Sequence, residues 1–294
     1  MGLVETIKRA AVEKVHGLFT VPPLETALAR LTRDHQLSDL VARLAPANLQ
    51  YQHPAYRQVI RHGITFMLDI SDYQDWILYW GLTTDRASEL YLLLQPDHVM
   101  FDVGTNIGEV CMTAAGLVGP RGMVYAFEPD PISFRKLTGN LALNRFGNIF
   151  ASNVGLGDAP ATLQMKVDCP TNRGANRIQR GPQTGDTFSI HIDTLDAFVA
   201  QRELRRLDMI KIDVEGFELS VLKGAHQALT RFRPRLFVEV SDRNLRQQGT
   251  NAAELIAFIR AAGYSVHRTG TGEEIDERHD FGGAFDVICR PLER

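Results

Sequence analysis

Residues 210–222, IKIDVEGFELSVL, place one lysine and three carboxylates beside apolar residues. The charged residues are Lys211, Asp213, Glu215 and Glu218. A carboxylate at a reaction centre can act as a general base, and a neighbouring lysine can keep it ionised or orient a substrate. The same residues would also suit the start of a surface helix, where first-turn carboxylates favour the helix dipole. The surrounding elements must decide between these two interpretations.

Residues 207–214, LDMIKIDV, have the composition of a buried β-strand. Side chains alternate between the two faces of a strand, so Lys211 and Asp213 share one face. Asp213 then ends the strand, and ligands in open α/β sheets bind beyond the carboxyl ends of the strands. A carboxylate at this position is costly to bury without a role, so we predict that Asp213 borders a cofactor and acts in the reaction.

The other charges of this stretch have different expectations. Glu215 is a second candidate for the general base, although it could instead cap the following helix. Lys211 could pair with Asp213 as part of the site or form a purely structural buried ion pair. Glu218 falls in the first turn of the next helix, so we expect it to be structural. Glu239 ends the following strand on the same rim and is a weaker candidate for contact with the substrate.

Two alternatives for the chemistry remain open. Asp213, Glu215 and Glu239 could together hold magnesium, which prefers carboxylate oxygens. The nearby Lys211 argues against a cation there, so we assign no metal ligands. His191 is an alternative base, although a lone histidine in a strand more often has a structural role.

Strands and helices alternate after Pro96. Repeated βα units with apolar strands predict a doubly wound, mostly parallel α/β sheet of the Rossmann-like type, with helices on both faces. The sequence has seven candidate strands for this sheet, at residues 98–103, 123–128, 148–154, 207–214, 233–240, 264–268 and 284–290. The helices between them include one long helix predicted over residues 217–229.

The chain is expected to divide near residue 96. We predict that residues 1–95 form a helical cap with a short β-hairpin about His62 and Gly63, and that residues 96–294 form the main domain. Helical periodicity in the cap extends over residues 5–19, 24–34, 37–44, 73–81 and 85–94. No motif in the cap can be attached to a chemistry.

The first strand of the main domain ends in FDVGTNIGE. Asn106 replaces the middle glycine of a dinucleotide-binding fingerprint, and no Gly-Lys-Ser/Thr ending of a P-loop follows, so an NAD-linked oxidoreductase is disfavoured. A turn with Gly104 and Gly108 at a helix N-terminus still suits a carboxylate, and Asp102 suits an ammonium group. Glu128, 24 residues after Gly104, lies where an acid accepts from ribose hydroxyls. These sites together predict a ligand in which an amino acid is joined to a nucleoside, and S-adenosylmethionine is such a ligand.

Several segments in order resemble the FkbM-type methyltransferases. They are FDVGTNIGEV, GPRGMVYAFEPDP, NLALN, NVGLGD, IDTLDAF, IKIDVEGFELSVLKGA and RPRLFVEV, and the resemblance is strong from about residue 101 to residue 240. It implies a class I methyltransferase that uses S-adenosyl-L-methionine and usually acts on a hydroxyl of a sugar or secondary metabolite. The remaining alternatives are an N- or carboxyl-methyltransferase and a cofactor-binding module without catalysis.

The resemblance also assigns cofactor residues. It implies that Asp102, Gly104, Asn106 and Gly108 hold the methionine end and that Glu128 holds the ribose. By the same resemblance, the adenine would be bordered by Asn153 and Val154 and approached by Asp158, which could equally be a turn residue. One departure is Cys111, which stands where the family often has a hydroxyl residue.

An insertion at about residues 159–192 separates the third and fourth strands of the sheet. Its flanks, residues 161–167 and 188–195, predict a β-hairpin. Its polar, glycine-rich middle contains Arg173, Arg177 and Arg180. This segment could be a mobile lid whose arginines bind a phosphate or carboxylate of the acceptor, or simply a solvated loop.

Composition narrows the class of protein further. The formal net charge of −3 gives no electrostatic case for nucleic-acid binding. Cys111, Cys169 and Cys289 form no CxxC pair, which suits a reducing compartment. No apolar run is long enough to span a membrane, and no signal peptide is evident. We therefore expect a cytoplasmic enzyme for a small-molecule acceptor, with N-terminal helices that could supply a homodimer surface.

Overall fold

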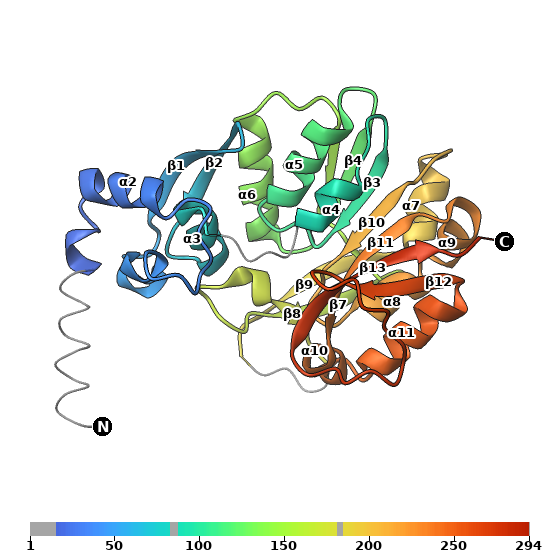
Figure 1. Ribbon diagram of the computed structural model, residues 1–294. Coiled ribbons are helices and arrows are strands. Elements are labelled where there is room, and N and C mark those ends of the chain that lie inside the picture. Colours follow the sequence, from blue (N-terminus) through green and yellow to red (C-terminus); the bar gives the residue numbers. More distant parts are fainter. Residues whose placement is uncertain (1–15, 83–87, 181–184, 294) are drawn as a thin grey trace. The chain divides into compact units, whose positions relative to one another are not determined.

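The computed structural model describes residues 16–82, 88–180 and 185–293 (Figure 1). Its contacts divide the chain into two compact units, which we describe separately. The first unit is Met1–Asp85 with Cys169–Gly174, and the second is Arg86–Asp168 with Ala175–Arg294. The insertion predicted between the third and fourth strands therefore contributes six residues to the first unit. The predicted domain boundary near residue 96 stays a prediction.

The second unit is built on a seven-stranded sheet, as predicted. The strand order is β12-β13-β11-β10-β3-β4-β5, in which β13 runs antiparallel to β11 and β12 and the pairs among β11, β10, β3, β4 and β5 are parallel. The bounds are β3 Val99–Val103, β4 Met123–Phe127, β5 Ile149–Ser152, β10 Met209–Ile212, β11 Arg235–Ser241, β12 Tyr264–Arg268 and β13 Ala284–Pro291. Figure 1 shows these strands side by side, with helices beside the sheet.

Alternating side chains separate an apolar face of the central strands from a polar one. Phe101 and Ile210 belong to a large core with residues of α7, α8, α9 and α11. Asp102 and Lys211, their immediate neighbours, therefore point to the opposite face. The helices of this unit are α4 Ser88–Leu93, α5 Glu109–Val118, α6 Pro131–Ala142, α7 Leu195–Gln201, α8 Glu218–Lys223, α9 His226–Phe232, α10 Asp242–Gln247 and α11 Ala252–Ala261.

The predicted hairpin is present and belongs to a small second sheet. β7 (Ala161–Lys166) pairs antiparallel with β9 (Thr187–Asp193). Two short strands complete the order β6-β9-β7-β8, with β6 at Gly155–Leu156 and β8 at Arg177–Ile178. Ile178 is thereby paired with the hairpin, and residues 181–184 of the insertion lie outside the described residues.

Two helix predictions were wrong. The helix predicted over residues 217–229 is divided into α8 and α9 at Gly224. A Cβ atom at Gly224 would lie 1.9 Å from the backbone oxygen of Gly157. The close approach of these two segments of the backbone therefore accounts for the break. Residues 37–44 contain only a 3-10 turn, Ala42–Leu44. There the Asp39 carboxylate accepts from the Gln36 backbone at 3.0 Å, a local bond that competes with a helix.

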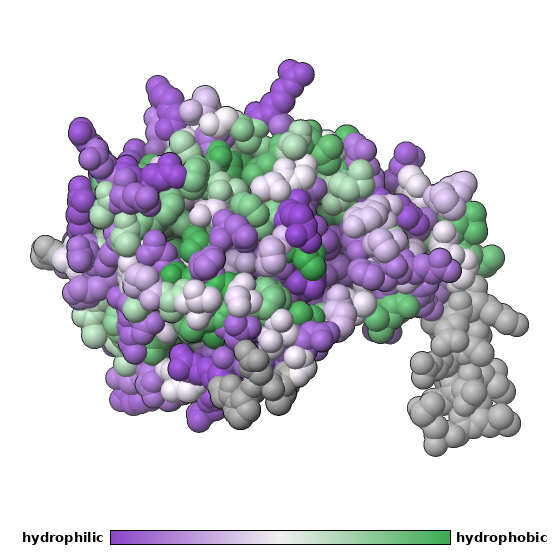
Figure 2. Space-filling view, turned by 180° about the vertical axis from the view of Figure 1, so that it is seen from behind, coloured by the Kyte–Doolittle hydropathy of each residue, from purple (hydrophilic) through white to green (hydrophobic). Residues whose placement is uncertain are grey.

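The first unit combines short helices with one hairpin. It contains α2 (Pro22–Leu31), η2 (Asn48–Gln50), β1 (Tyr56–Arg61), β2 (Ile64–Asp69) and α3 (Tyr73–Trp80), and β1 and β2 pair about His62 and Gly63 as predicted. The helix predicted over residues 5–19 lies mostly outside the described residues. Hydrophilic and hydrophobic residues are interspersed over the face drawn in Figure 2, as is usual for protein surfaces. Among the described residues, no helix is long and apolar enough to cross a membrane.

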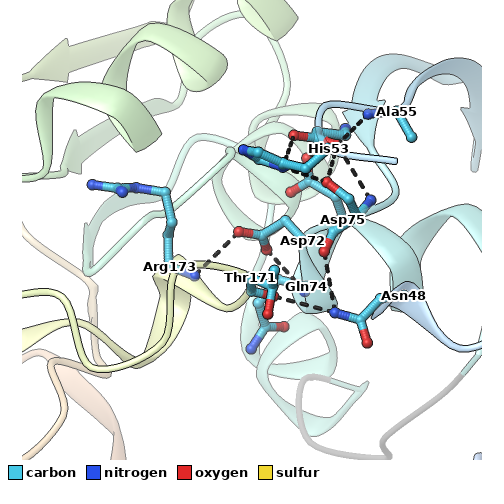
Figure 3. Close-up of polar contacts among 10 residues, drawn as sticks. Asn48, His53, Ala55, Asp72, Gln74, Asp75, Thr171 and Arg173 are labelled. Atoms are coloured by element: carbon cyan, nitrogen blue, oxygen red, sulfur yellow. Dashed lines mark hydrogen bonds and ion pairs between the residues drawn. The ribbon is translucent and has the colours of Figure 1, made fainter. Parts of the chain in front are cut away.

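Residues 169–174 are held in the first unit by backbone contacts (Figure 3). The Asp72 carboxylate caps α3 and also accepts from the backbone N–H of Arg173 at 3.1 Å. The backbone oxygen of Thr171 accepts from Tyr73 at 2.8 Å and from Asn48 at 3.3 Å. This part of the insertion is therefore fastened to the start of α3.

Candidate active site

The turn after β3 requires its two glycines. Gly104 and Gly108 have φ angles of 82° and 97°, a region that other residues rarely adopt. A Cβ atom at Gly104 would lie 1.9 Å from the backbone oxygen of Asp213, and one at Gly108 would lie 2.6 Å from Leu137 Cδ1. The turn therefore passes directly against the end of β10, which brings the predicted cofactor turn and the opening stretch together. Asn106, at φ 53°, completes the turn.

Glu128 follows β4 and is connected to that turn. Its Oε2 accepts from the backbone N–H of Asn106 at 2.8 Å, and its Oε1 accepts from that of Asp130 at 2.9 Å. Burial raises the pKa of Glu128 to about 7, although the two backbone hydrogen bonds favour the ionised form. A carboxylate has roughly four acceptor positions, so two remain for hydroxyl groups of a ligand.

The residues predicted to border adenine follow β5. The Asn153 side-chain amide donates to the backbone oxygens of Glu128 at 2.8 Å and Pro129 at 3.1 Å. Val154 packs against the apolar core, and Asp158 is exposed. Asn153 therefore joins the ends of β4 and β5, whereas no comparable contact fixes the side chain of Asp158 among the described residues.

Lys211 connects three parts of the site. Its ammonium donates to the backbone oxygen of Gly104 at 2.9 Å and lies 3.4 Å from Asp102 Oδ1 and 3.6 Å from Asp213 Oδ2. Burial by itself would lower the pKa of Lys211, but the carboxylates of Asp213 and Asp102 raise it above its ordinary value. Lys211 therefore carries a positive charge between the cofactor turn and Asp213. Asp102 was expected to suit an ammonium group, and in this structure the ammonium group beside the buried Asp102 is that of Lys211.

The candidate bases converge at the rim of the sheet. Carboxylate oxygens of Asp213, Glu215 and Glu239 lie within 4.8 Å of one another. The Asp213 side chain is 45% exposed, so it can reach a ligand, whereas Glu239 is 7% exposed. This spacing would allow a divalent cation to bridge the three oxygens, and Lys211 already supplies one positive charge beside Asp213.

Glu218 shapes the turn between β10 and α8. Its buried Oε1 accepts from the backbone N–H groups of Val214 at 3.2 Å and Gly216 at 3.0 Å. Burial raises the pKa of Glu218 to about 7. The turn contains Glu215 at φ 54° and Gly216 at φ 100°. Glu218 thus acts as a clamp inside the turn, in agreement with the structural role expected for it.

This clamp predicts a pH effect on stability. The folded protein binds the Glu218 proton more tightly than the unfolded chain does, because the pKa rises from 4.5 to about 7 on folding. Its contribution to the free energy of unfolding is therefore complete below about pH 4.5 and is lost as the pH rises through about 7. The glutamine of Glu218→Gln cannot titrate, so its free energy of unfolding does not undergo this loss. Between about pH 5 and pH 8, the free energy of unfolding of Glu218→Gln should therefore rise by up to about 3 kcal/mol relative to that of wild type.

Chemical denaturation at each pH measures this difference. Glu273→Gln replaces an exposed carboxylate of the same unit and should follow the wild-type pH dependence. Parallel pH curves for Glu218→Gln and wild type would contradict the prediction.

The three arginines of the insertion have different surroundings. Arg173 belongs to the first unit. The guanidinium of Arg177 contacts Asp168 and donates to Gln247. That of Arg180 donates to Gln248 at 3.2 Å and lies 6.0 Å from the centre of the Phe217 ring. Both second-unit arginines are thus engaged by protein groups in this structure, and their contact with a substrate stays a prediction.

His191 and Cys111 both form contacts with neighbouring protein groups. His191 on β9 is exposed, and its Nδ1 lies 3.4 Å from Thr162 Oγ1 within the small sheet. Cys111 is fully buried, and its thiol donates to the backbone oxygen of Gly108 at 3.3 Å. Burial raises the pKa of Cys111 well above its ordinary value. Cys111 therefore replaces the hydroxyl of similar sequences as a packed residue of α5.

One residue of the site was missed in the sequence. The Asn244 amide donates to Glu215 Oε2 at 2.6 Å from the start of α10. Its position in the sequence could have indicated Asn244 as a site residue. The helix α10 begins directly after β11, so it starts at the same edge of the sheet as the end of β10.

The fold and the site together define a class I methyltransferase. The sheet is seven-stranded and mostly parallel, as predicted, and β13 runs antiparallel to its two neighbours. A glycine turn after β3 packs against the charged end of β10, and an acid after β4 bonds to that turn. A model of the methyltransferase FkbM domain matches residues 102–266, more than half of the chain. The chain therefore belongs to the FkbM methyltransferase family.

Curated relatives are similar over parts of the chain. The hexuronic acid methyltransferase AglP of Haloferax volcanii is 31% identical over 155 residues, which covers 51% of this chain and 61% of AglP. The chain thus spans less than two thirds of that relative. The 31-O-demethyl-FK506 methyltransferase FkbM of Streptomyces tacrolimicus is 28% identical over 217 residues, with 64% and 81% covered. A solved methyltransferase FkbM of Methylobacillus flagellatus has a TM-score of 0.46 at 20% identity, with 69% and 46% covered.

Proposed function

We propose that the protein transfers a methyl group from S-adenosyl-L-methionine to a hydroxyl of a sugar or secondary metabolite. The observation that carries this proposal is the position of Lys211, which contacts both the glycine turn at Gly104 and the carboxylate of Asp213. A cofactor site and a candidate base are thereby joined by one charged group. The arrangement suits a reaction in which a cofactor and an acceptor must be aligned and a proton removed.

The residues around the turn fit this cofactor. Glycines at positions 104 and 108 let the turn pack where Cβ atoms would collide with the protein, and the turn leads into the N-terminus of α5, which favours a carboxylate. Glu128 retains acceptor capacity for the two ribose hydroxyls. Asn153 and Val154 lie after the neighbouring strand, where the adenine would be placed. When bound, S-adenosylmethionine supplies an electrophilic methyl group on a sulfonium centre.

The charged residues at the ends of β10 and β11 would act on the acceptor. Asp213 is exposed enough to accept the hydroxyl proton, and its Oδ2 lies 3.6 Å from the Lys211 ammonium. Glu215 and Glu239 lie beside Asp213 and can hydrogen-bond further hydroxyls of a polyol acceptor. Two relatives are named for a hexuronic acid and for a 31-O-demethyl compound, which supports an oxygen acceptor. The three free thiols suit a cytoplasmic location, which is part of the proposal.

The proposal is tested in two steps. Calorimetry should show binding of S-adenosylmethionine and S-adenosylhomocysteine and no binding of NAD. Transfer of a labelled methyl group is then measured with hexoses, uronic acids, amino sugars and hydroxylated macrolides. Methyl ethers as products support the proposal, whereas methyl amines or methyl esters would replace it with an N- or carboxyl-methyltransferase. A rate that disappears with EDTA and returns with magnesium would assign a cation to the three carboxylates.

A further inference from the structure

Asn244 contacts two functional segments through one amide group. Its Nδ2 donates to Glu215 Oε2 at 2.6 Å, and its Oδ1 accepts from Arg177 Nη1 at 3.5 Å. A carboxylate can only accept and a guanidinium can only donate, so both contacts require the same orientation of the amide. The side chain of Asn244 is therefore held in place from both ends.

The backbone of α10 also packs against the turn that contains Glu215. A Cβ atom at Gly216 would lie 2.4 Å from the backbone oxygen of Asn244. Glu218 bonds the same turn from inside through Val214 and Gly216. Glu215 itself adopts φ 54°, a conformation that is unfavourable for a residue with a side chain. Contacts on both sides of the turn thus compensate for this backbone strain.

The Glu215 carboxylate needs such support because of its neighbours. Asp213 and Glu239 have carboxylate oxygens within 4.8 Å of it and would repel it, while the Lys211 ammonium lies beyond Asp213. A hydrogen bond from an amide fixes a carboxylate in one direction without adding charge. The Asn244 bond therefore holds the Oε2 atom of Glu215 in one direction within the acidic cluster.

We propose that Asn244 is a positioning residue for methyl transfer, which holds the Glu215 carboxylate toward the acceptor side of Asp213. This inference rests on the proposed function, in which Glu215 shares the work at the acceptor. It also gives Arg177 a role other than binding a substrate anion. Arg177 fixes Asn244 and Gln247 of α10, so the insertion supports Glu215 through this helix.

A double-mutant cycle tests the role of Asn244. Asn244→Ala should lower the single-turnover rate by about tenfold, the effect of one lost hydrogen bond to a charged group. Asn244→Asp preserves the shape but opposes two carboxylates, so its loss should be at least as large. In a Glu215→Gln background, Asn244→Ala should change the rate by less than about twofold, because residues that act as a unit are not additive. Gln227→Ala, which removes an exposed amide from α9 of the same unit, is the matched control and should retain the wild-type rate.

The measurements separate positioning from stability. S-adenosylhomocysteine affinity and the thermal midpoint are measured for each variant, and both should stay near wild type in Asn244→Asp. Equal losses from Asn244→Ala in the two backgrounds, or a loss of the same size in the control Gln227→Ala, would overturn the proposal. So would a fully active Glu215→Gln, although the proposed function would then continue through Asp213. Failure of the wild type to bind S-adenosylhomocysteine would instead overturn the proposed function itself.

Discussion

Asp213→Asn should lower the rate of methyl transfer by at least about a hundredfold, the lower range for loss of a general base. Asparagine preserves the shape and one acceptor oxygen, but it removes the basic group and the charge that faces Lys211 at 3.6 Å. Affinity for the cofactor should change less, because our proposal assigns Asp213 to the acceptor and Glu128 to the ribose. The measurement is a single turnover with saturating cofactor, so that product release does not hide the chemical step.

Two variants serve as comparisons for Asp213→Asn. Glu218→Gln removes a buried charge from the same stretch and should retain most activity, since Glu218 bonds only backbone groups of the turn in the described contacts. Lys211→Met should lose rate as well, because it removes the ammonium group that lies between the Gly104 turn and Asp213. Normal turnover by Asp213→Asn, together with an inactive but folded Glu218→Gln, would invert the assignment. Activity in all these variants would direct the search for the base to Glu239 or His191.

The second large effect is expected for Glu128→Ala. Loss of a charged acceptor for the ribose hydroxyls should weaken S-adenosylhomocysteine binding by about 1.5–3 kcal/mol. That corresponds to an affinity loss of roughly ten- to a hundredfold. The change also removes the bonds from Asn106 and Asp130, so the variant must be shown to be folded by its circular dichroism spectrum. Unchanged affinity in a folded Glu128→Ala protein would refute the assignment.

Glu128 also predicts how binding depends on pH. Burial raises its pKa to about 7 in the protein without ligand. Ribose hydroxyls donate to the ionised carboxylate, so affinity should rise with pH until about 7 and then level off. Glu128→Gln should bind more weakly and without this dependence. Calorimetry in buffers with different ionisation enthalpies would show proton release below about pH 7 in wild type and none in the variant.

The sequence alone determined the fold class and much of the candidate site. Periodicity and glycine spacing predicted the seven strands, their α/β arrangement and the hairpin, because buried strands and turns leave local patterns. Alternation along β10 correctly placed Lys211 and Asp213 on one face, where the structure has them 3.6 Å apart. The methyltransferase family also followed from the order of the motifs, and the FkbM domain match confirmed it.

The tertiary structure decided which groups contact one another across the sequence. The bond from Lys211 to Gly104 joins residues 107 positions apart, and the bond from Asn244 to Glu215 joins residues 29 positions apart. Only packing shows that Arg177 is engaged by α10 and that residues 169–174 belong to the first unit. The same holds for the helix break at Gly224, which depends on the Gly157 backbone from another part of the chain. Local patterns report periodicity and burial, whereas the partner of a buried polar group is set by chain segments that meet only in the folded protein.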